Sequence, residues 1–237
     1  MPFFCYYGGK WRAALRYPAP AEDVIIEPFA GSAGYALRRG ATRQVILRDL
    51  DECVIGTWQY LISVSEQEIL GLPDLEPGQT VHDLNLPQEA RWLIGWWLNK
   101  GSAQPRNMPS RWMRDGIRPA SYWGPQIRER IASSLLGIRH WKAELGDYAS
   151  APDVAATWFI DPPYQKEGRH YRYGSGLLDY ADLAEWCQGR RGQVIVCENA
   201  GADWLPFKDL GVIKGTPGRA RRGVSREVCY HSAPDHN

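Results

Sequence analysis

Short apolar runs and a glycine-containing turn alternate along the first fifty residues, and their order predicts an α/β fold. Val24–Glu27 is a β-branched run that ends at a proline, which is typical of a buried strand. The Gly/Ser segment Phe29–Gly34 predicts a turn, and the apolar stretch Tyr35–Leu37 behind it predicts a helix. Val45–Leu47 predicts a second strand, with Asp49 at its carboxyl end. This order is typical of a nucleotide-binding half of a doubly wound sheet.

A second block of strands and helices is predicted in the last third of the chain. The apolar run 156–160 stops at an acid and two prolines, and it predicts another buried strand. Asp179–Cys187 has the pattern of a helix that begins at a capping aspartate. Residues 194–197 are a β-branched run typical of a strand, and Arg226–His231 predicts part of a final hairpin.

The region between the two blocks follows a different pattern. It contains an apolar helix over Gln88–Leu98, a loop rich in Pro, Gly and Arg over Gly101–Pro119, and a long helix over about Pro125–Lys142. The pattern therefore predicts a small, mainly helical subdomain over residues 60–140.

The bulk composition fits one domain with an insertion. A chain of 237 residues can bury one sizeable core, and its 44% hydrophobic and 23% charged residues are typical of a globular protein. We expect a single α/β domain, formed by residues 1–59 and 141–237, into which residues 60–140 are inserted.

Several functional classes are excluded by what the sequence lacks. No apolar run approaches the roughly 20 residues that cross a bilayer, and the N-terminus lacks the pattern of a signal peptide. None of the five cysteines belongs to a Cys-x-x-Cys pair, so we expect reduced thiols and no metal site. The five histidines form no triad or metal-ligand spacing, and packing or surface roles are expected for them. We therefore expect a cytoplasmic protein that does not contact membranes.

Charge is unevenly distributed, although the whole chain carries a net charge of only +1. Residues 66–89 hold six acidic residues and no Lys or Arg, whereas residues 101–142 hold eight Lys or Arg and two acidic residues. Trp112, Tyr122 and Trp123 lie within the basic segment, and arginines interleaved with aromatic residues suit phosphate contact and base stacking. The alternative is that these arginines only solvate the surface and pair with the acidic segment. The candidate DNA contacts are Arg106, Arg111, Arg114 and Arg118, with Arg222 in a second basic run.

The sharpest chemical signal is Asp-Pro-Pro-Tyr directly after the strand at 156–160. A strand stopped by prolines is one explanation, but it does not account for the acid at the mouth of a sheet, where α/β folds bind ligands. The chemical explanation accounts for all four residues. Asp161 and the Pro162 carbonyl accept hydrogen bonds from an adenine amino group, Pro162 and Pro163 hold the chain rigid, and Tyr164 stacks on an extruded base.

A second signal is the glycine-containing turn Glu27–Gly34 after the first strand. Its glycines allow a ligand to approach the main chain, and the absence of a G-x-G-x-x-G pattern argues against a dinucleotide. Asp49, after the next strand, is placed to bind ribose hydroxyls. The alternative for Asp49 is an N-cap of the following helix.

Taken together, these residues resemble the Dam-like family of DNA adenine methyltransferases. Tyr6–Lys10 is similar to the family's aromatic-x-Gly-Gly-Lys motif, and Glu27–Gly34 to its Glu-Pro-Phe-x-Gly cofactor loop. Arg48–Asp51 resembles the ribose-binding motif, Gly146–Tyr148 the motif near the cofactor's adenine, and Asp161–Tyr164 the catalytic motif. The order of the motifs also agrees. One departure is an alanine at position 33, where the family has its second glycine.

The resemblance implies the fold, the cofactor and the reaction. The expected fold is a Rossmann-like methyltransferase sheet whose helical insert recognises the target, and the expected partner is double-stranded DNA, bound by a monomer or weak dimer. The methyl group of S-adenosylmethionine would move directly to N6 of an extruded adenine, without a covalent enzyme intermediate. The implied cofactor-site residues are Tyr6, Tyr7, Lys10, Glu27, Phe29, Gly31, Ser32, Asp49, Asp147, Tyr148 and Asp161.

Other substrates remain open at this point. Cytosine N4, an RNA adenine or a protein glutamine would be methylated by similar chemistry, although an aspartate at position 161 favours adenine. A DNA-binding relative that has lost catalysis is a further alternative. The target sequence, and whether a restriction nuclease accompanies the enzyme, are not indicated.

Overall fold

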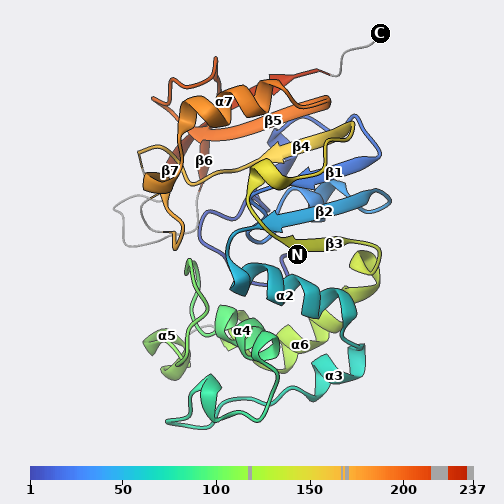
Figure 1. The fold of residues 1–237 in the computed structure, drawn as a ribbon. Coiled ribbons are helices and arrows are strands. Elements are labelled where there is room, and N and C mark those ends of the chain that lie inside the picture. The colour runs from blue at the N-terminus through green and yellow to red at the C-terminus, as the bar shows by residue number, and fades with distance from the viewer. Residues whose placement is uncertain (117–118, 167, 169–170, 215–223, 234–237) are drawn as a thin grey trace.

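A mixed β-sheet forms the centre of the computed structural model, which describes residues 1–116, 119–166, 168, 171–214 and 224–233 (Figure 1). Within these residues the sheet has seven strands in the order β3-β2-β1-β4-β5-β7-β6. The first five are parallel, and β7 is antiparallel to both of its neighbours. The strands are β1 (Val24–Glu27), β2 (Gln44–Asp49), β3 (Lys142–Leu145), β4 (Ala156–Ile160), β5 (Gly192–Asn199), β6 (Lys208–Lys214) and β7 (Val224–Ser232).

The order of the strands reverses between β1 and β4. Ile25 of β1 pairs with Val45 of β2 on one side and with Thr157 of β4 on the other. Chain connections therefore run outwards in opposite directions from these two strands. In open α/β sheets, ligands bind outside the carboxyl ends of the strands at such a point.

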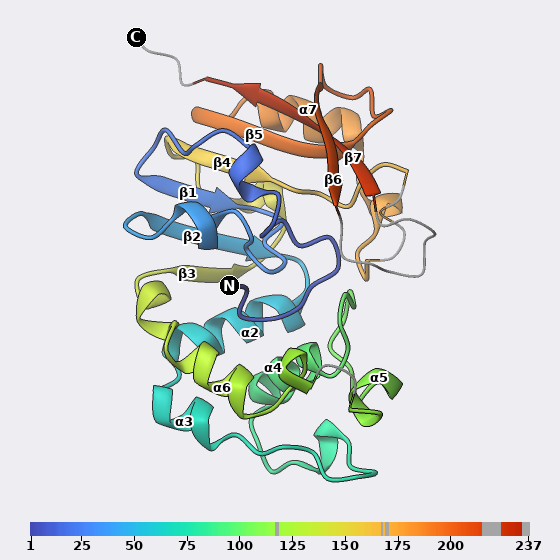
Figure 2. The same cartoon turned by 180° about the vertical axis from the view of Figure 1, so that it is seen from behind.

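Both faces of the sheet are covered, which is why β4 is buried along its whole length. Ile26 and Trp158 belong to the cluster that packs beneath α7 (Tyr180–Gln188). Their neighbours Ile25 and Phe159 belong to the larger cluster on the opposite face. Residues of the N-terminal segment, α1 (Ala36–Arg39) and α2 (Glu52–Ser63) belong to this larger cluster, and α2 lies at the β3 edge of the sheet in both views (Figures 1 and 2).

The remaining helices gather beyond the β3 edge of the sheet (Figures 1 and 2). They are α3 (Glu66–Gly71), α4 (Gln88–Trp97), α5 (Arg111–Arg114) and α6 (Pro125–Ala132). Short 3-10 helices occupy Ala14–Arg16, Val81–Asp83, Pro119–Ser121, Leu135–Ile138, Tyr148–Ser150 and Ser175–Leu177.

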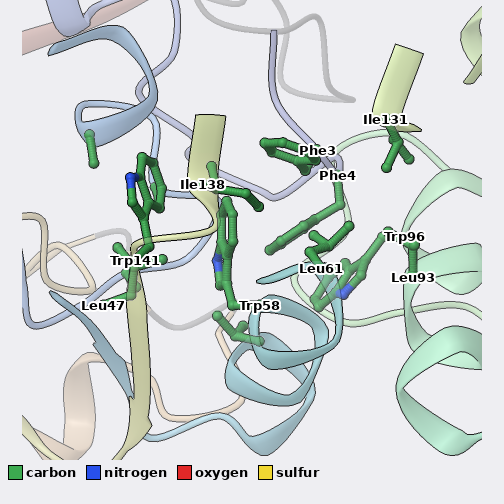
Figure 3. Packing of buried hydrophobic residues seen from close by; sticks show 14 of the residues in the cluster. Phe3, Phe4, Leu47, Trp58, Leu61, Leu93, Trp96, Ile131, Ile138 and Trp141 are labelled. Atoms are coloured by element: carbon green, nitrogen blue, oxygen red, sulfur yellow. The ribbon is translucent and has the colours of Figure 1, made fainter. Parts of the chain in front are cut away.

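These helices share one core with the sheet (Figure 3). The ring centroid of Phe4 lies 5.3 Å from those of Trp58 in α2 and Trp96 in α4. Trp141, just before β3, lies 5.8 Å from Trp58. Because aromatic residues of this size dominate core packing, the helical region is anchored to the sheet. The proposed boundaries of an inserted subdomain at 60 and 140 stay a prediction.

The structure confirms the α/β class and a mostly parallel sheet, including strands at 24–27 and 156–160 with the predicted bounds. The predicted helix over Pro125–Lys142 is wrong in length, because α6 ends at Ala132 and Lys142 already belongs to β3. The hydroxyls of Ser133 and Ser134 both donate to the Arg130 carbonyl, at 3.1 and 2.8 Å, where they compete with the main-chain ladder. No helix in the described part of the chain is long and apolar enough to cross a membrane.

Candidate functional site

A pocket opens at the point where the strand order reverses. The pocket and its open mouth together hold about 850 Å³ of space that protein atoms leave free. Its walls come from the N-terminal segment, the loops after β1 and β4, the end of β2, and the turn after β3. All the cofactor-site residues expected from the sequence line it: Tyr6, Tyr7, Lys10, Glu27, Phe29, Gly31, Ser32, Asp49, Asp147, Tyr148 and Asp161.

Asp49, the last residue of β2, accepts hydrogen bonds from two main-chain amides. Its Oδ2 accepts a hydrogen bond from Gly31 N at 3.0 Å, and its Oδ1 accepts from Asp51 N at 2.9 Å. The N-cap of α2 is Asp51, whose side chain accepts from Cys53 N, so Asp49 does not serve as the helix cap. Burial raises the pKa of Asp49 to about 6, and the amide donors oppose that rise. Asp49 is therefore an ionised acceptor at neutral pH in the pocket wall.

The turn after β1 has an unusual main-chain conformation at Ala33. Its φ is +47°, and it is the one non-glycine residue with positive φ in the described chain. This is the position at which the sequence departs from the Dam-like pattern of glycines. Gly34 beside it has no room for a side chain, because a Cβ there would lie 2.4 Å from Trp11 N. The turn and the N-terminal motif therefore pack main chain against main chain.

Glu27, at the end of β1, fixes where the helix after this turn begins. Its Oε1 accepts a hydrogen bond from Ala36 N at 2.6 Å, and the residue is only 2% exposed. Burial raises the pKa of Glu27 to about 8, so the side chain is mostly protonated at neutral pH.

Lys10 brings the N-terminal motif to the loop after β4. Its Nζ lies 2.8 Å from Asp161 Oδ1 and donates to the Gly8 carbonyl at 3.0 Å. The same ammonium lies 4.8 Å from the centre of the Tyr164 ring. Burial acts to lower the pKa of Lys10, but Asp161 and Glu227 outweigh it, so its pKa lies above the ordinary value. Burial raises the pKa of Asp161 to about 6, although the Lys10 charge opposes this.

The Asp-Pro-Pro-Tyr loop is held by side chains from two other elements. Tyr180 Oη, from α7, donates to the Pro163 carbonyl at 2.6 Å. Tyr164 Oη donates to Glu227 of β7. Among the described residues no donor binds the Pro162 carbonyl, which the sequence analysis assigned as a substrate acceptor. Of the four residues of this motif, Asp161 and Pro163 line the pocket, whereas Pro162 and Tyr164 are not among its lining residues.

Aromatic rings form the wall beneath the turn after β3. Phe29 and Tyr148 are stacked with centroids 5.5 Å apart and planes at 26°. Tyr148 also meets Trp186 of α7 edge-on at 5.1 Å. Asp147 Oδ1 caps this turn by accepting from Ser150 N at 3.1 Å. Phe29 and Tyr148 together make an apolar face suited to a flat ring.

Part of the pocket wall was missed in the sequence. Tyr171, Arg172 and Tyr173 line it, and Tyr171 Oη donates to the Tyr7 carbonyl at 3.4 Å. Arg172 Nη1 lies 3.2 Å from Glu52 Oε1 and 3.4 Å from the Asp51 carboxylate. The alternation Tyr-Arg-Tyr shortly after Asp-Pro-Pro-Tyr was the available signal. Leu177 and Leu178 complete this side of the pocket.

Three of the arginines assigned to DNA lie on the surface around α5, and two lie outside the described residues. Arg106, Arg111 and Arg114 are exposed, and Trp112 between them is 61% exposed. In Figure 1, α5 lies on the side toward which the arrowheads of β2 and β4 point. The Ser102 carbonyl accepts from Tyr7 N at 3.0 Å, so the loop before α5 contacts the pocket wall. Arg118 and Arg222 fall in segments that are not described.

The other two aromatic residues that we expected to stack on bases are not on this surface. Tyr122 and Trp123 are buried, and Trp123 Nε1 donates to the Pro73 carbonyl at 2.8 Å. One arginine of the segment does pair with the acidic segment, because Arg128 contacts Asp74. For Arg128, therefore, the alternative of pairing with the acidic segment holds.

No protein-family model matches the chain, and neither does any curated protein. Among the described residues, no group of three or more His, Cys, Asp or Glu side chains is arranged to hold a metal ion. The site combines an aromatic wall, a buried carboxylate at the end of β2 and a lysine-paired carboxylate after β4.

Proposed function

We propose that this protein is a DNA adenine N6-methyltransferase that uses S-adenosylmethionine. The observation that carries the proposal is the Lys10–Asp161 contact, because it joins the N-terminal motif to the Asp-Pro-Pro-Tyr loop inside one pocket. The sheet is accordingly proposed to be a Rossmann-like methyltransferase sheet, with residues 60–140 as its target-recognition insert. The reversal of strand order places the pocket where such a sheet binds ligands.

The donor set of the pocket fits the cofactor. Asp49 offers carboxylate oxygens to ribose hydroxyls at the end of β2, and the Phe29–Tyr148 wall offers a face to the adenine ring. When bound, S-adenosylmethionine supplies an electrophilic methyl group. The protein's own contribution is to hold the acceptor nitrogen next to it.

Asp161 is the residue that activates the acceptor nitrogen in this proposal. Its Oδ1 is occupied by Lys10, which leaves Oδ2 to accept from the amino group of the base. The Pro162 carbonyl accepts the second amino hydrogen, since no described residue occupies it. Two acceptors in fixed positions draw the nitrogen towards a tetrahedral geometry, and they need no rearrangement during the reaction. Its lone pair would then bond to the methyl carbon as the bond from that carbon to the sulfonium sulfur breaks, which leaves a neutral thioether. The proton that the amino group gives up would pass to Asp161 Oδ2 or to water.

A transfer assay on three substrates tests this function. Tritiated S-adenosylmethionine is incubated with the protein and with duplex DNA, RNA or a protein extract, and label on N6 of DNA adenine is expected. Label on cytosine N4, on RNA or on protein would show that the substrate is not DNA adenine. Binding of DNA without any label would favour a non-catalytic relative.

The matched variant for this assay is Asp161→Asn. It should lose about 100-fold or more of the transfer rate, because the loop loses its charged acceptor. Asp153→Asn serves as control, since Asp153 pairs with Arg190 and Arg191 away from the pocket. A normal rate in Asp161→Asn would contradict the assignment.

A further inference from the structure

One buried carboxylate next to the site is not used by the proposed reaction. Glu227, in β7, is 7% exposed and lies opposite Asn199 of β5 in the sheet. Its Oε2 accepts hydrogen bonds from two tyrosines, Tyr164 after β4 and Tyr17 at 3.3 Å. A buried carboxylate is costly unless donors compensate it, and here both donors are tyrosine hydroxyls.

The two tyrosines reach Glu227 from distant parts of the chain. Tyr17 follows the first 3-10 helix, is 2% exposed, and packs edge-on against Phe159 of β4 with ring centroids 5.2 Å apart. Burial raises the pKa of Tyr17 and of Tyr164 well above the ordinary value. Both hydroxyls therefore stay protonated and donate at every pH at which the protein would work.

The Tyr164 ring is held from more than one direction as a result. Its hydroxyl is bound by Glu227, and the Lys10 ammonium lies over its face. The next residue is also fixed, because Gln165 N donates to Glu198 Oε2 at 3.0 Å. A side chain anchored at its tip and along its main chain cannot change rotamer freely. It is therefore set in place before any ligand arrives.

We propose that Glu227 is a positioning residue that holds the Tyr164 ring as a ready-made stacking face for the substrate base, and that Tyr17 holds Glu227. The inference rests on the proposed function, since the base is the ligand of that ring. A carboxylate suits this task because hydrogen bonds to a charged acceptor are shorter and stronger than those between neutral groups.

The test compares turnover at pH 8, where Asp161 is ionised, in variants of these three residues. Glu227→Gln keeps an acceptor oxygen, so it should lower kcat by about ten-fold, and Glu227→Leu should lower it further. The dissociation constant of S-adenosylmethionine should change less than two-fold in both variants, because Glu227 does not line the pocket. In a Tyr164→Phe background, Glu227→Gln should have almost no additional effect on kcat.

A matched control separates positioning from stability. Tyr35 also has a buried hydroxyl and stacks on Phe159, but it donates to the Pro18 carbonyl. Tyr17→Phe should lower kcat several-fold, whereas Tyr35→Phe should leave kcat unchanged below its melting temperature. An undiminished effect of Glu227→Gln in the Tyr164→Phe background, or a normal kcat in Glu227→Leu, would overturn the inference. An inactive wild-type protein would instead overturn the proposed function.

Discussion

Lys10 and Asp161 form a buried ion pair between the N-terminal segment and the end of β4, with 2.8 Å between Nζ and Oδ1. A lone buried carboxylate would be mostly protonated, and a protonated Asp161 would lose an acceptor for the amino group. The lysine therefore keeps the carboxylate ionised and occupies one of its oxygens.

Methyl transfer should be lost as the pH falls through about 6. Burial raises the pKa of Asp161 to about 6, so the carboxylate is ionised above that pH and protonated below it. At saturating cofactor, kcat should fall about ten-fold for each pH unit below 6 and level off above 7. The cofactor must be saturating because Asp49, which is proposed to bind it, also has a pKa of about 6, so cofactor binding would weaken over the same pH range. A flat kcat between pH 5 and 8 would show that Asp161 does not act as a carboxylate.

Lys10→Gln should move this decline to higher pH. The Lys10 charge lowers the pKa of Asp161, and removing an opposite charge at this distance typically raises a carboxyl pKa by roughly 1–3 units. The midpoint of the kcat profile is therefore expected at least one unit higher. Lys208→Gln, in the exposed edge strand β6, is the control and should keep the wild-type midpoint. An unmoved midpoint in Lys10→Gln would rule out the electrostatic role of Lys10.

Asp49→Ala should weaken the binding of S-adenosylmethionine. The loss of one or two charge-assisted hydrogen bonds to the ribose raises the dissociation constant by about 10- to 100-fold. Calorimetric titration measures this, and circular dichroism checks that the variant is folded. Asp209→Ala, whose carboxylate pairs with Arg226, should bind the cofactor normally. Unchanged affinity in folded Asp49→Ala would remove Asp49 from the site.

The motif residues were predictable because each follows the carboxyl end of a parallel strand. Glu27, Asp49 and Asp161 end or follow β1, β2 and β4, so the sheet brings them together. Glu227 was not predictable in this way. Its place depends on β7 inserting between β5 and β6, and no local pattern records that pairing.

Long-range contacts in the helical region were also not predictable from local sequence patterns. Trp123 follows a basic, loop-like segment, and nothing in the local sequence indicates that it packs over the Pro73 carbonyl. Tyr171 contacts the Tyr7 carbonyl, 164 residues earlier in the chain, and Arg172 contacts Asp51, 121 residues earlier. Such long-range contacts follow from the packing of whole elements, which short sequence patterns do not encode.

Ala33→Gly should be nearly neutral for stability, although it removes a buried methyl group. The positive φ costs an L-residue about 1–2 kcal/mol, which offsets the lost methyl and the added freedom of the unfolded chain. Ala36→Gly is the matched control. Ala36 is equally buried but lies in α1, so glycine there should cost about 1.5–2 kcal/mol. Chemical denaturation measures both, and equal losses would show that Ala33 is not strained.

The surface around α5 is expected to contact DNA, and salt dependence distinguishes phosphate contacts from stacking. Each arginine that binds a phosphate releases counterions, so replacing Arg106, Arg111 and Arg114 by alanine should reduce the salt slope by about three in total. Trp112→Ala should instead weaken binding by about 1–3 kcal/mol without changing the slope, because stacking releases no counterions.

Arg191→Ala is the control for these measurements. Its side chain is 62% exposed and pairs with Asp153 near the start of β5, away from the carboxyl ends of the strands. It should leave both affinity and slope unchanged. If the triple variant also keeps its slope and its target sequence, recognition does not reside at α5. The basic run that contains Arg222 would then be the next candidate, because phosphate binding requires positive charge and that run has four arginines within eight residues.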